Sequence, residues 1–322
     1  MADIATLTLN PTLDVSFEVE RIAPTHKLRG DKERHDPGGG GINVARVFVR
    51  LGGNARCYYL AGGATGAALD WLLDLHQLVR SKIPISGETR VSTSIFVRES
   101  GGEYRFVTDG PLVSAAEWQA CEQQLEEARC EYLVASGSLP RGVPADFYAR
   151  IAAIARRRGI RFVLDSSGEG LAQGLAGGGV FLVKPSLGEL RRLTGEALKD
   201  DRAVAEAARA IVARGQAELV AVTMGRDGAM LVDASGTLRL PAIPVEASSA
   251  VGAGDSFLAG MIHALAEGRT AAEAFRFGQA AGAAAVLTPG TDLARADDIR
   301  RLYAAALAAP PAGAGHAGRE QG

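Results

Sequence analysis

The chain has 322 residues, and its 35 basic and 37 acidic side chains give a formal net charge of −2, which argues against nucleic acid as the main partner. Its three cysteines, Cys57, Cys121 and Cys130, lack metal-ligand spacing, so they argue against a zinc site or a disulfide framework and favour a reducing compartment. The sequence shows no signal-peptide pattern and no apolar run of membrane-spanning length, and we therefore expect a cytoplasmic protein without a membrane partner.

The first third of the chain predicts one buried strand and then strands that are polar on one side. Residues 4–9 are typical of a buried strand, whereas polar and apolar side chains alternate from 14 to 36, the period of a strand with one wet face. Four glycines at 38–41 interrupt that alternation. The elements expected after them are a helix at 42–51, a strand at 55–60, a helix at 65–75 and a hairpin of 91–97 with 103–107 around Ser100-Gly101-Gly102.

Beyond residue 114, apolar strands alternate with helices, which predicts a mostly parallel sheet covered on both faces. The half-polar strands of the first third do not suit such a buried sheet, so we expect them to form a small separate sheet, within about 12–37 and 88–108. One domain is expected over 1–308 and a disordered tail, rich in Pro, Gly and Ala, over 309–322. The strands are expected at 132–135, 161–164, 180–183 and 219–222, and the helices at 115–128 (capped by Ser114 and Glu117), 145–158, 204–214 and about 258–265.

The most informative segment is Gly252-Ala253-Gly254-Asp255, which enters the apolar helix-like run near the C-terminus. Glycines let backbone N–H groups approach an anion, and a helix N-terminus favours negative charge. An acid at that point would repel a bound phosphate unless it takes a proton from a hydroxyl that attacks the phosphate. Asp255 is therefore a candidate general base in phosphoryl transfer.

A second segment, Gly38 to Asn43, places four glycines before a helix. A flexible loop alone would explain them poorly because such a run is entropically costly, so the pattern favours close backbone approach to a ligand, with Asn43 bonding its hydroxyls. It lacks the Gly-x-Gly-x-x-Gly fingerprint of dinucleotide sites and does not directly follow a buried strand. Asp14, Lys27 and Arg90 are each ordinary surface charges when taken alone, but together on a flap facing this loop they suit a polyol phosphate.

Further polar or small residues follow predicted strands, where ligand crevices open in parallel sheets. Lys184 ends one strand, and Ser138 follows another. Thr223 and Gly225 end a third strand and also suit any tight turn. Ser186 and Glu189 have the spacing of a helix capping box, which is a purely structural alternative for that pair.

In this order and at these separations, the motifs resemble the PfkB branch of the ribokinase-like carbohydrate kinases, from about the first strand to Leu307. The resemblance rests mainly on residues 39–43 and 252–255, and the runs 6–11, 61–66 and 104–107 are similar to the branch that phosphorylates fructose 6-phosphate. It implies a three-layer α/β/α ribokinase-like fold whose central sheet is mostly parallel and whose small β-sheet is a lid. In such enzymes the lid also builds a homodimer.

The activity that the resemblance implies is phosphorylation of fructose 6-phosphate at its 1-hydroxyl by ATP with Mg²⁺, giving fructose 1,6-bisphosphate. Asp255 would be the base, and the amides of Gly252, Ala253 and Gly254 the anion hole. The resemblance also implies which residues bind the substrates. Sugar hydroxyls would be bound by Asp14, Gly38, Gly39 and Asn43, and the 6-phosphate by Lys27 and Arg90, with Ser138 nearby. The nucleotide would be bound by Lys184, Ser186, Thr223, Gly225, Ser249, Val251 and Gly254, and Glu189 would contact the magnesium shell through water.

The chain departs from the family pattern at two positions. Ser186 replaces an asparagine, which puts a contact with magnesium-bound water in doubt, and Ala250 replaces a common threonine, which removes a hydroxyl on the nucleotide side. Gly40 stands where 1-phosphofructokinases and tagatose-6-phosphate kinases usually carry lysine. These sibling activities stay as alternatives, as does a sugar-phosphate sensor without catalysis. A nicotinamide-dependent oxidoreductase is disfavoured because no glycine fingerprint follows the first strand.

Overall fold

The structure, a computed structural model, describes residues 3–246, 249–288 and 290–308. The predicted tail at 309–322 lies outside these residues. Across the described segments, no helix combines the length and the apolar character needed to cross a membrane.

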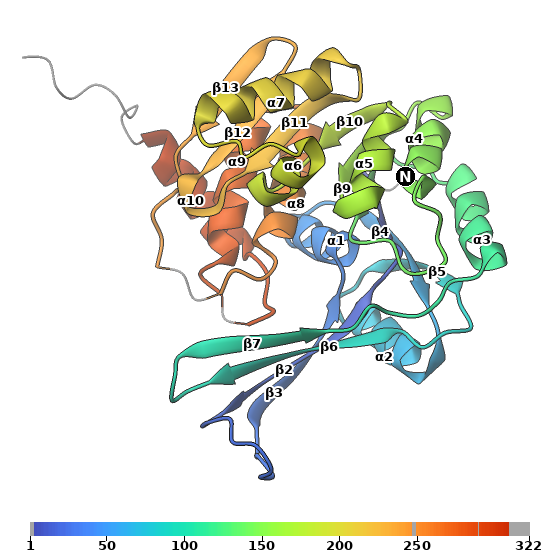
Figure 1. Ribbon diagram of the computed structural model, residues 1–322, viewed down its shortest axis with the longest axis vertical. Coiled ribbons are helices and arrows are strands. Elements are labelled where there is room, and N and C mark those ends of the chain that lie inside the picture. The colour runs from blue at the N-terminus through green and yellow to red at the C-terminus, as the bar shows by residue number, and fades with distance from the viewer. Residues whose placement is uncertain (1–2, 247–248, 289, 309–322) are drawn as a thin grey trace, which may run out of the picture.

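A nine-stranded sheet forms the centre of the fold (Figure 1). Its strands are β1 (Ile4–Thr8), β4 (Ala55–Ala61), β5 (Val79–Pro84), β8 (Tyr132–Ser136), β9 (Arg161–Asp165), β10 (Val180–Val183), β11 (Ala217–Thr223), β12 (Ala229–Asp233) and β13 (Gly236–Leu240). They lie in the order β13-β12-β11-β10-β9-β8-β1-β4-β5. All neighbours from β11 to β5 are parallel, and the β12–β13 hairpin adds two antiparallel strands at one edge. The prediction of a mostly parallel sheet is confirmed.

Helices cover both faces of this sheet, which makes the three layers that the sequence predicts. One layer packs α1 (Gly40–Arg50), α8 (Ala253–Ala266), α9 (Ala271–Ala285) and α10 (Ala296–Ala308) against the sheet, with α2 (Gly63–Leu75) beside them. The other layer contains α3 (Ala115–Glu126), α4 (Phe147–Arg157), α5 (Gly168–Ala176), α6 (Leu187–Thr194) and α7 (Asp201–Ala213).

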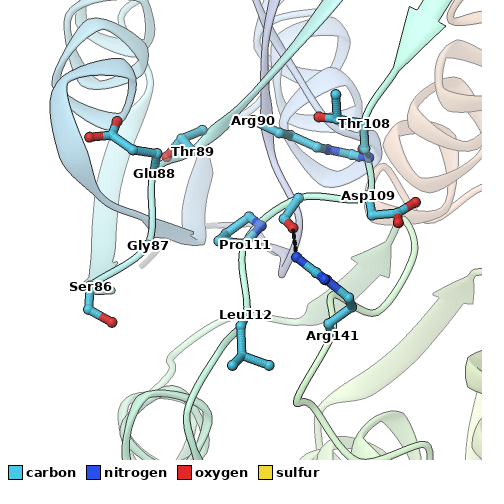
Figure 2. A pocket seen from close by; sticks show the side chains of 11 residues that line it. Ser86, Gly87, Glu88, Thr89, Arg90, Thr108, Asp109, Pro111, Leu112 and Arg141 are labelled. Atoms are coloured by element: carbon cyan, nitrogen blue, oxygen red, sulfur yellow. Dashed lines mark hydrogen bonds between the residues drawn. The ribbon is translucent and has the colours of Figure 1, made fainter.

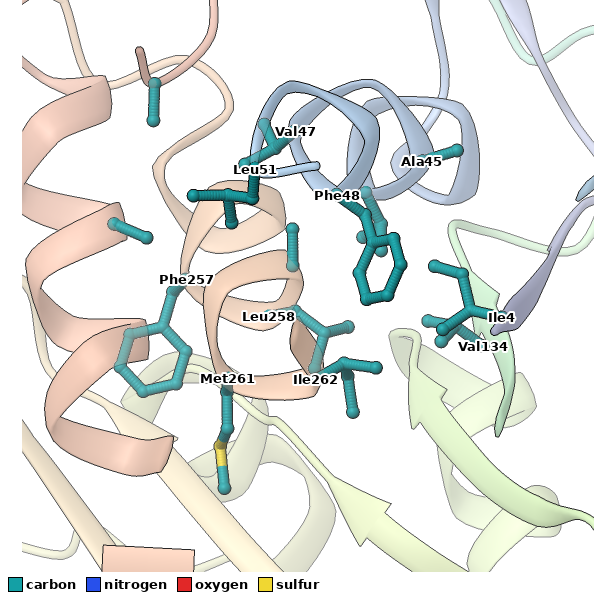
Figure 3. Packing of buried hydrophobic residues seen from close by; sticks show 14 of the residues in the cluster. Ile4, Ala45, Val47, Phe48, Leu51, Val134, Phe257, Leu258, Met261 and Ile262 are labelled. Atoms are coloured by element: carbon teal, nitrogen blue, oxygen red, sulfur yellow. The ribbon is translucent and has the colours of Figure 1, made fainter. Parts of the chain in front are cut away.

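The contact between α1 and α8 is apolar. In Figure 3, Phe48 of α1 lies between Ile4 and Val134 of the sheet and Leu258 and Ile262 of α8. All five side chains are almost completely buried. Burying an aromatic or branched aliphatic side chain contributes about 1.5–3 kcal/mol, so this packing holds the N-termini of the two helices in a fixed relation.

Four strands form the separate small sheet, which we call the lid: β2 (Thr12–Val19), β3 (Asp31–Gly38), β6 (Arg90–Val97) and β7 (Gly102–Val107). Their order is β3-β2-β6-β7, and Figure 1 shows the sheet projecting from the carboxyl end of β1. Strand register places Asp14 beside Asp36 and Ser92 on one face. Val15 and Phe106 lie on the opposite face. The alternation of polar and apolar side chains in the sequence therefore corresponds to the two faces of the lid.

The sequence prediction omitted several elements: β5, α5, β12, β13, α9 and α10. β5 is a half-exposed edge strand without a continuous apolar run. α5 contains three glycines, which lower its helix propensity, and tertiary packing overrides that preference. Two predicted helix starts also move: α1 begins at Gly40, inside the glycine run, and α8 begins at Ala253.

Candidate active site

A cavity of about 250 Å³ lies where the lid meets the carboxyl ends of β8 and β9 and the N-termini of α1 and α8. Residues far apart in the sequence meet there because parallel strands end at the same edge of the sheet. The lining residues are Thr12, Asp14, Gly39, Gly40, Asn43, Arg90, Ser92, Arg105, Val107, Ser136, Gly137, Ser138, Asp165, Ser166, Ser167, Glu189 and Asp255.

Asp255 lies in the first turn of α8. Gly252 caps the helix with a left-handed φ of 70°, and a side chain there would meet Leu293 at 2.3 Å, so both conformation and space require glycine. The N–H groups of a first helical turn have no intrahelical acceptor, and the helix dipole adds positive potential at this end. The segment from Gly252 to Gly254 therefore presents donors beside a carboxylate.

The Asp255 carboxylate is tied to the opposite helix, since Asn43 Nδ2 of α1 donates to Asp255 Oδ2 at 2.9 Å. Burial raises the pKa of Asp255 to about 6, and the nearby Asp165 adds to the rise, whereas Asn43, Lys184 and Arg105 oppose it. A carboxylate with such a pKa is ionised at neutral pH and is still a better proton acceptor than an ordinary aspartate.

Asp165 was missed by the sequence prediction. Asp165 ends β9; its Oδ1 pairs with Lys184 Nζ at 3.0 Å, and its Oδ2 accepts from Ser136 Oγ at 3.1 Å. Burial lowers the pKa of Lys184, but Asp165, then Asp255 and Glu189, outweigh it and raise that pKa overall. A buried ammonium is thus kept charged beside α8. The run Asp165-Ser166-Ser167 directly follows a predicted strand. Lys184 was singled out for the same reason, so this signal could also have identified Asp165.

The glycine run packs tightly against the protein itself. A Cβ on Gly38 would lie 2.2 Å from Asp14 Oδ2, and one on Gly40 would lie 2.1 Å from Ser136 Oγ. Gly39 has a φ of 113° and lines the cavity. The glycines therefore also allow the close approach of the lid and β8, and their approach to a ligand stays a prediction.

Asp14 faces the cavity from β2 with only 6% of its surface exposed. Its Oδ1 has no hydrogen-bond partner among the described residues. Burial raises the pKa of Asp14 to about 6, although Arg105 and Arg46 oppose the rise. A buried, unpartnered carboxylate oxygen is costly, and a ligand hydroxyl would relieve that cost.

Of the basic side chains considered for phosphate binding, Arg90 and Arg105 line the cavity and Lys27 does not. Arg90 is fixed because Nη1 donates to the Thr108 carbonyl and Nη2 to the Asn10 carbonyl, both at 2.9 Å, while its Nε is buried without a partner among the described residues. Arg105 of β7 also lines the cavity and was missed as a site residue; alternation along the hairpin places it on the Asp14 face.

Lys27 does not join Arg90 within this chain. It is exposed in the segment between β2 and β3 and does not line the cavity. β2 starts at the cavity with Thr12 and runs eight residues away from it, and at about 3.3 Å per residue this carries the following loop roughly 25 Å away. Within one copy of the chain, Lys27 therefore lies away from the cavity that Arg90 lines, and its contact with the 6-phosphate stays a prediction.

Arg90 also borders a second hollow of about 680 Å³, shown in Figure 2. Its wall includes Glu88, Asp109 and Arg141, and Arg141 Nη2 donates to the Gly110 carbonyl at 3.3 Å. Ser138 lies on the cavity side, where its Oγ accepts from Asn10 Nδ2 at 3.4 Å. Arg90 thus separates two hollows at the base of the lid.

None of the seven residues predicted for the nucleotide is among the residues that line the cavity. Ser186 and Thr223 form a parallel bridge, so the ends of β10 and β11 bring them together, and Gly225 follows with a φ of 58°. The capping box of Ser186 and Glu189 is present, with Glu189 Oε2 accepting from both the amide and the hydroxyl of Ser186 at 2.8 Å. Glu189 lines the cavity as well. Ser249 Oγ accepts from the Val251 amide at 3.2 Å in the approach to α8.

Comparison with known proteins identifies the fold and its relatives. The pattern of the pfkB family carbohydrate kinases matches residues 8–298, most of the chain. The chain belongs to this family. The ATP-dependent 6-phosphofructokinase isozyme 2 of Mycobacterium tuberculosis is 42% identical over 310 residues, covering 96% of this chain and 90% of the relative. The protein of the same description from Escherichia coli is 41% identical over 305 residues, covering 94% and 99%.

Solved structures within the family agree with the sequence comparison. The Escherichia coli phosphofructokinase-2 in complex with fructose 6-phosphate superposes with a TM-score of 0.89 at 40% identity, covering 95% of this chain and 100% of that one. The same enzyme has been described in a tetrameric inhibited form, at a TM-score of 0.89 and the same identity and coverage. A 1-phosphofructokinase of Xanthomonas campestris is more distant, at 32% identity over 273 residues, covering 83% of this chain and 86% of the relative.

The cavity of this pfkB family member suits magnesium brought in with a nucleotide better than a dedicated metal site. Among the described residues, no group of three or more His, Cys, Asp or Glu side chains is placed to hold a metal ion. Four carboxylates nevertheless line the cavity, and Asp165 and Glu189 are the two that the lid and α8 do not supply. Mg²⁺ commonly keeps several waters and binds through one or two carboxylates and substrate phosphates, which is compatible with this arrangement.

Proposed function

We propose that the chain is an ATP-dependent 6-phosphofructokinase that transfers the γ-phosphoryl group of ATP to the 1-hydroxyl of fructose 6-phosphate. The observation that carries this proposal is the position of Asp255, in the first turn of α8, between the donors of that helix and the Asp14 face of the lid. The identity of 41–42% to two isozyme 2 enzymes, against 32% to a 1-phosphofructokinase, supports the choice of sugar phosphate.

The lid and α1 would hold the sugar phosphate. Arg90, fixed at the base of the lid, would bind the 6-phosphate, with Ser138 and Arg105 nearby, because guanidinium groups bind phosphate in a fixed geometry. Asp14, whose Oδ1 lacks a partner within the described residues, would accept from sugar hydroxyls. The backbone at Gly38 and Gly39 and the Asn43 amide would complete this half of the site.

The nucleotide would lie on the other side of α8. The residues proposed to hold it follow β10 and β11 or precede α8: Lys184, Ser186, Thr223, Gly225, Ser249 and Val251. Lys184, buried and charged beside Gly254, would meet the phosphates. Mg²⁺ bound to those phosphates would neutralise the developing charge, and Glu189 would contact its shell through water.

In the reaction, Asp255 takes the proton of the 1-hydroxyl as that oxygen forms a bond to the γ-phosphorus. The bond from the γ-phosphorus to the bridging oxygen of ADP breaks in line with it. The amides from Gly252 to Gly254 donate hydrogen bonds to the oxygens of the transferring phosphoryl group. Stabilisation of the transition state by such fixed donors is usually the largest single contribution to catalysis. Asp255 then returns its proton to solvent after the products leave.

We further propose a homodimer formed through the lid, in the cytoplasm. The lid face opposite the cavity carries Val15, Phe17, Ile95, Tyr104 and Phe106 in neighbouring register positions. Tyr104 is 49% and Phe106 56% exposed in the single chain. An apolar face of this kind is covered in most proteins, and a second copy would cover it. The three buried free thiols suit a reducing compartment.

Steady-state turnover with Mg-ATP on fructose 6-phosphate, tagatose 6-phosphate and fructose 1-phosphate, measured side by side, tests the proposed substrate. We expect the highest kcat/KM on fructose 6-phosphate. A clear preference for either other sugar would replace the substrate proposed here. Binding of sugar phosphate with no turnover on any of the three would instead support a sensor, and Ser186→Asn and Ala250→Thr would then be the first reversions to make.

A further inference from the structure

Beneath the cavity lies a buried ion pair that joins the lid to α1. Arg46 of α1 and Asp36 of β3 are paired through Arg46 Nη2 and Asp36 Oδ1 at 3.0 Å, and their side chains are only 2% and 6% exposed. Arg46 Nη1 donates to the Pro37 carbonyl at 3.1 Å, at the point where β3 enters the glycine run. The guanidinium thus fixes the root of the lid against the helix.

The same guanidinium also reaches Asn43, one turn earlier on α1. Arg46 Nη1 lies 3.4 Å from Asn43 Oδ1, while Asn43 Nδ2 donates to Asp255 at 2.9 Å. A guanidinium only donates hydrogen bonds and an ionised carboxylate only accepts them. Arg46 on one side and Asp255 on the other therefore select one orientation of the Asn43 amide, the one that stabilises the ionised base.

Packing alone does not explain this pair. Burying two charges costs several kcal/mol per ion before they attract each other, and apolar side chains of similar volume are often as stabilising. Arg46 Nε has no hydrogen-bond partner among the described residues, so the side chain is not satisfied at every donor. Asp36 Oδ2 accepts from Thr291 Oγ1 at 2.7 Å, which extends the network to the loop before α10.

We propose that Arg46 is a positioning residue for phosphoryl transfer: with Asp36 it holds the Asn43 amide toward Asp255 and fixes this geometry to the root of the lid. Arg46 is not among the residues that line the cavity, and its link to Asp255 runs through Asn43. The inference rests on the proposed kinase activity.

The chain offers a matched control in Arg50, the next turn of α1. Arg50 Nη1 donates to the Leu293 carbonyl at 2.8 Å and Nη2 to Asp292 at 3.2 Å, so it also ties α1 to the loop before α10. It makes no contact with Asn43 among the bonds of the described residues. If Arg46 had a purely structural role, substitutions at Arg46 and at Arg50 should have similar effects on stability and on kcat.

The test compares the double variant Arg46→Met with Asp36→Asn against Arg50→Met. Removing both charges leaves no unpaired ion in the core, and because Arg46 lowers and Asp36 raises the pKa of Asp14, the two losses act on that group in opposite directions. We expect the double variant to lose about tenfold to a hundredfold in kcat with a smaller change in the sugar-phosphate KM. Arg50→Met should keep wild-type kcat and lose only thermal stability.

A second readout is the pH at which kcat/KM falls on the acid side. Asp165 of β9, Lys184 after β10, Arg105 of β7 and Asn43 of α1 all act on Asp255, and only the Asn43 bond depends on Arg46. The acid limb should therefore move to higher pH in the double variant and stay in place in Arg50→Met. Adding Asn43→Ala to the double variant should move the acid limb no further, because the bond to Asp255 is already lost.

The outcomes separate cleanly. A folded double variant with wild-type kcat and an unmoved acid limb would overturn the positioning role. If the double variant does not fold by circular dichroism, Arg46→Lys gives the same test, because a single ammonium keeps the charge opposite Asp36 but lacks the fork that also reaches Pro37 and Asn43. Failure of the proposed function would show differently, as a wild-type protein without turnover on any sugar phosphate.

Discussion

Asp255 is basic because of what surrounds it. Burial and the neighbouring Asp165 disfavour its charge, while Asn43 and Lys184 limit the effect. These opposing effects leave Asp255 with a pKa of about 6. This pKa is close enough to neutral pH for efficient proton transfer and low enough for the carboxylate to be ionised at that pH.

We expect Asp255→Asn to lower kcat by about two to four orders of magnitude, because an amide keeps the shape and the bond to α1 but cannot accept a proton. Sugar-phosphate binding should stay nearly unchanged, as measured by calorimetry. Glu273→Gln is the control, since it makes the same change in the first turn of α9, outside the cavity lining. Near-normal turnover in Asp255→Asn would remove this residue from the role of base.

The pH dependence of kcat/KM should report the same carboxylate. Below pH 6 the base becomes protonated, so we expect activity to fall about tenfold per pH unit on the acid side. Initial rates across pH 4.5–8 at low sugar phosphate, corrected for irreversible inactivation, give this curve; these conditions are chosen to bracket the raised pKa of about 6. Asp14, with a pKa also raised to about 6, would steepen the fall if its ionised form is needed for binding.

Ionisation of Asp255 should raise activity as the pH rises but lower the stability of the folded protein. The folded pKa of Asp255 is raised from an ordinary 3.8 to about 6, so the folded state is disfavoured by ionisation of this group above pH 6 and not below 3.8. Asp255→Asn should therefore be more stable than wild type at pH 8 by on the order of 1–3 kcal/mol, with the gap closing as pH falls toward 4. Urea unfolding at both pH values measures it; an equal gap at the two pH values would contradict the raised pKa.

At the scale of elements, the lid combines two tasks on two faces. One face supplies Asp14, Arg90 and Arg105 to the cavity, and the other carries the aromatic side chains of β7. Both follow from strict alternation along β2, β6 and β7. A one-residue shift of register would exchange the faces and remove the site and the apolar surface together.

Phe106→Asp should convert a dimer into monomers, because it places a charge in the middle of the apolar lid face. Sedimentation velocity at micromolar concentration measures the change. Glu103→Gln, on the cavity face of the same strand, is the control and should leave the mass unchanged. A variant that keeps the wild-type mass would argue against association through this face.

Periodicity predicted the main strands, most helices and the separate small sheet, because burial on one or both sides imposes those patterns. It did not predict which strands are neighbours, so the meeting of Asp165, at the end of β9, with Lys184, after β10, could not be read from the chain. Arg105 was missed for a related reason: only the register of β7 against β6 and β2 turns it toward Asp14. Asn43 was singled out for a ligand, but its bond to Asp255 needs the packing of α1 on α8.

At the scale of the whole molecule, the three thiols are all in the core. Burial raises the pKa of Cys57 to about 12 and that of Cys130 to about 11, and it raises the pKa of Cys121 still further. Thiolates are the reactive form, so these cysteines are chemically protected while the fold is intact.

We therefore expect the native protein to resist an aromatic disulfide reagent such as 5,5′-dithiobis(2-nitrobenzoic acid), and to react at all three thiols when urea unfolds it. Absorbance at the released thiolate follows the reaction. The rate should track the unfolded fraction across a urea titration. Fast labelling of a thiol without urea would contradict the burial described here.

The bond between Asn43 and Asp255 joins residues 212 positions apart. A chain leaving the ribosome therefore carries the proposed sugar-binding half of its site long before the proposed base and anion hole, and α1 has no α8 to pack against until residues 253–266 have been made. A product that stops before α8 lacks Asp255, the proposed base, together with the first turn of that helix. Such incomplete chains should therefore not transfer phosphate from ATP to the sugar.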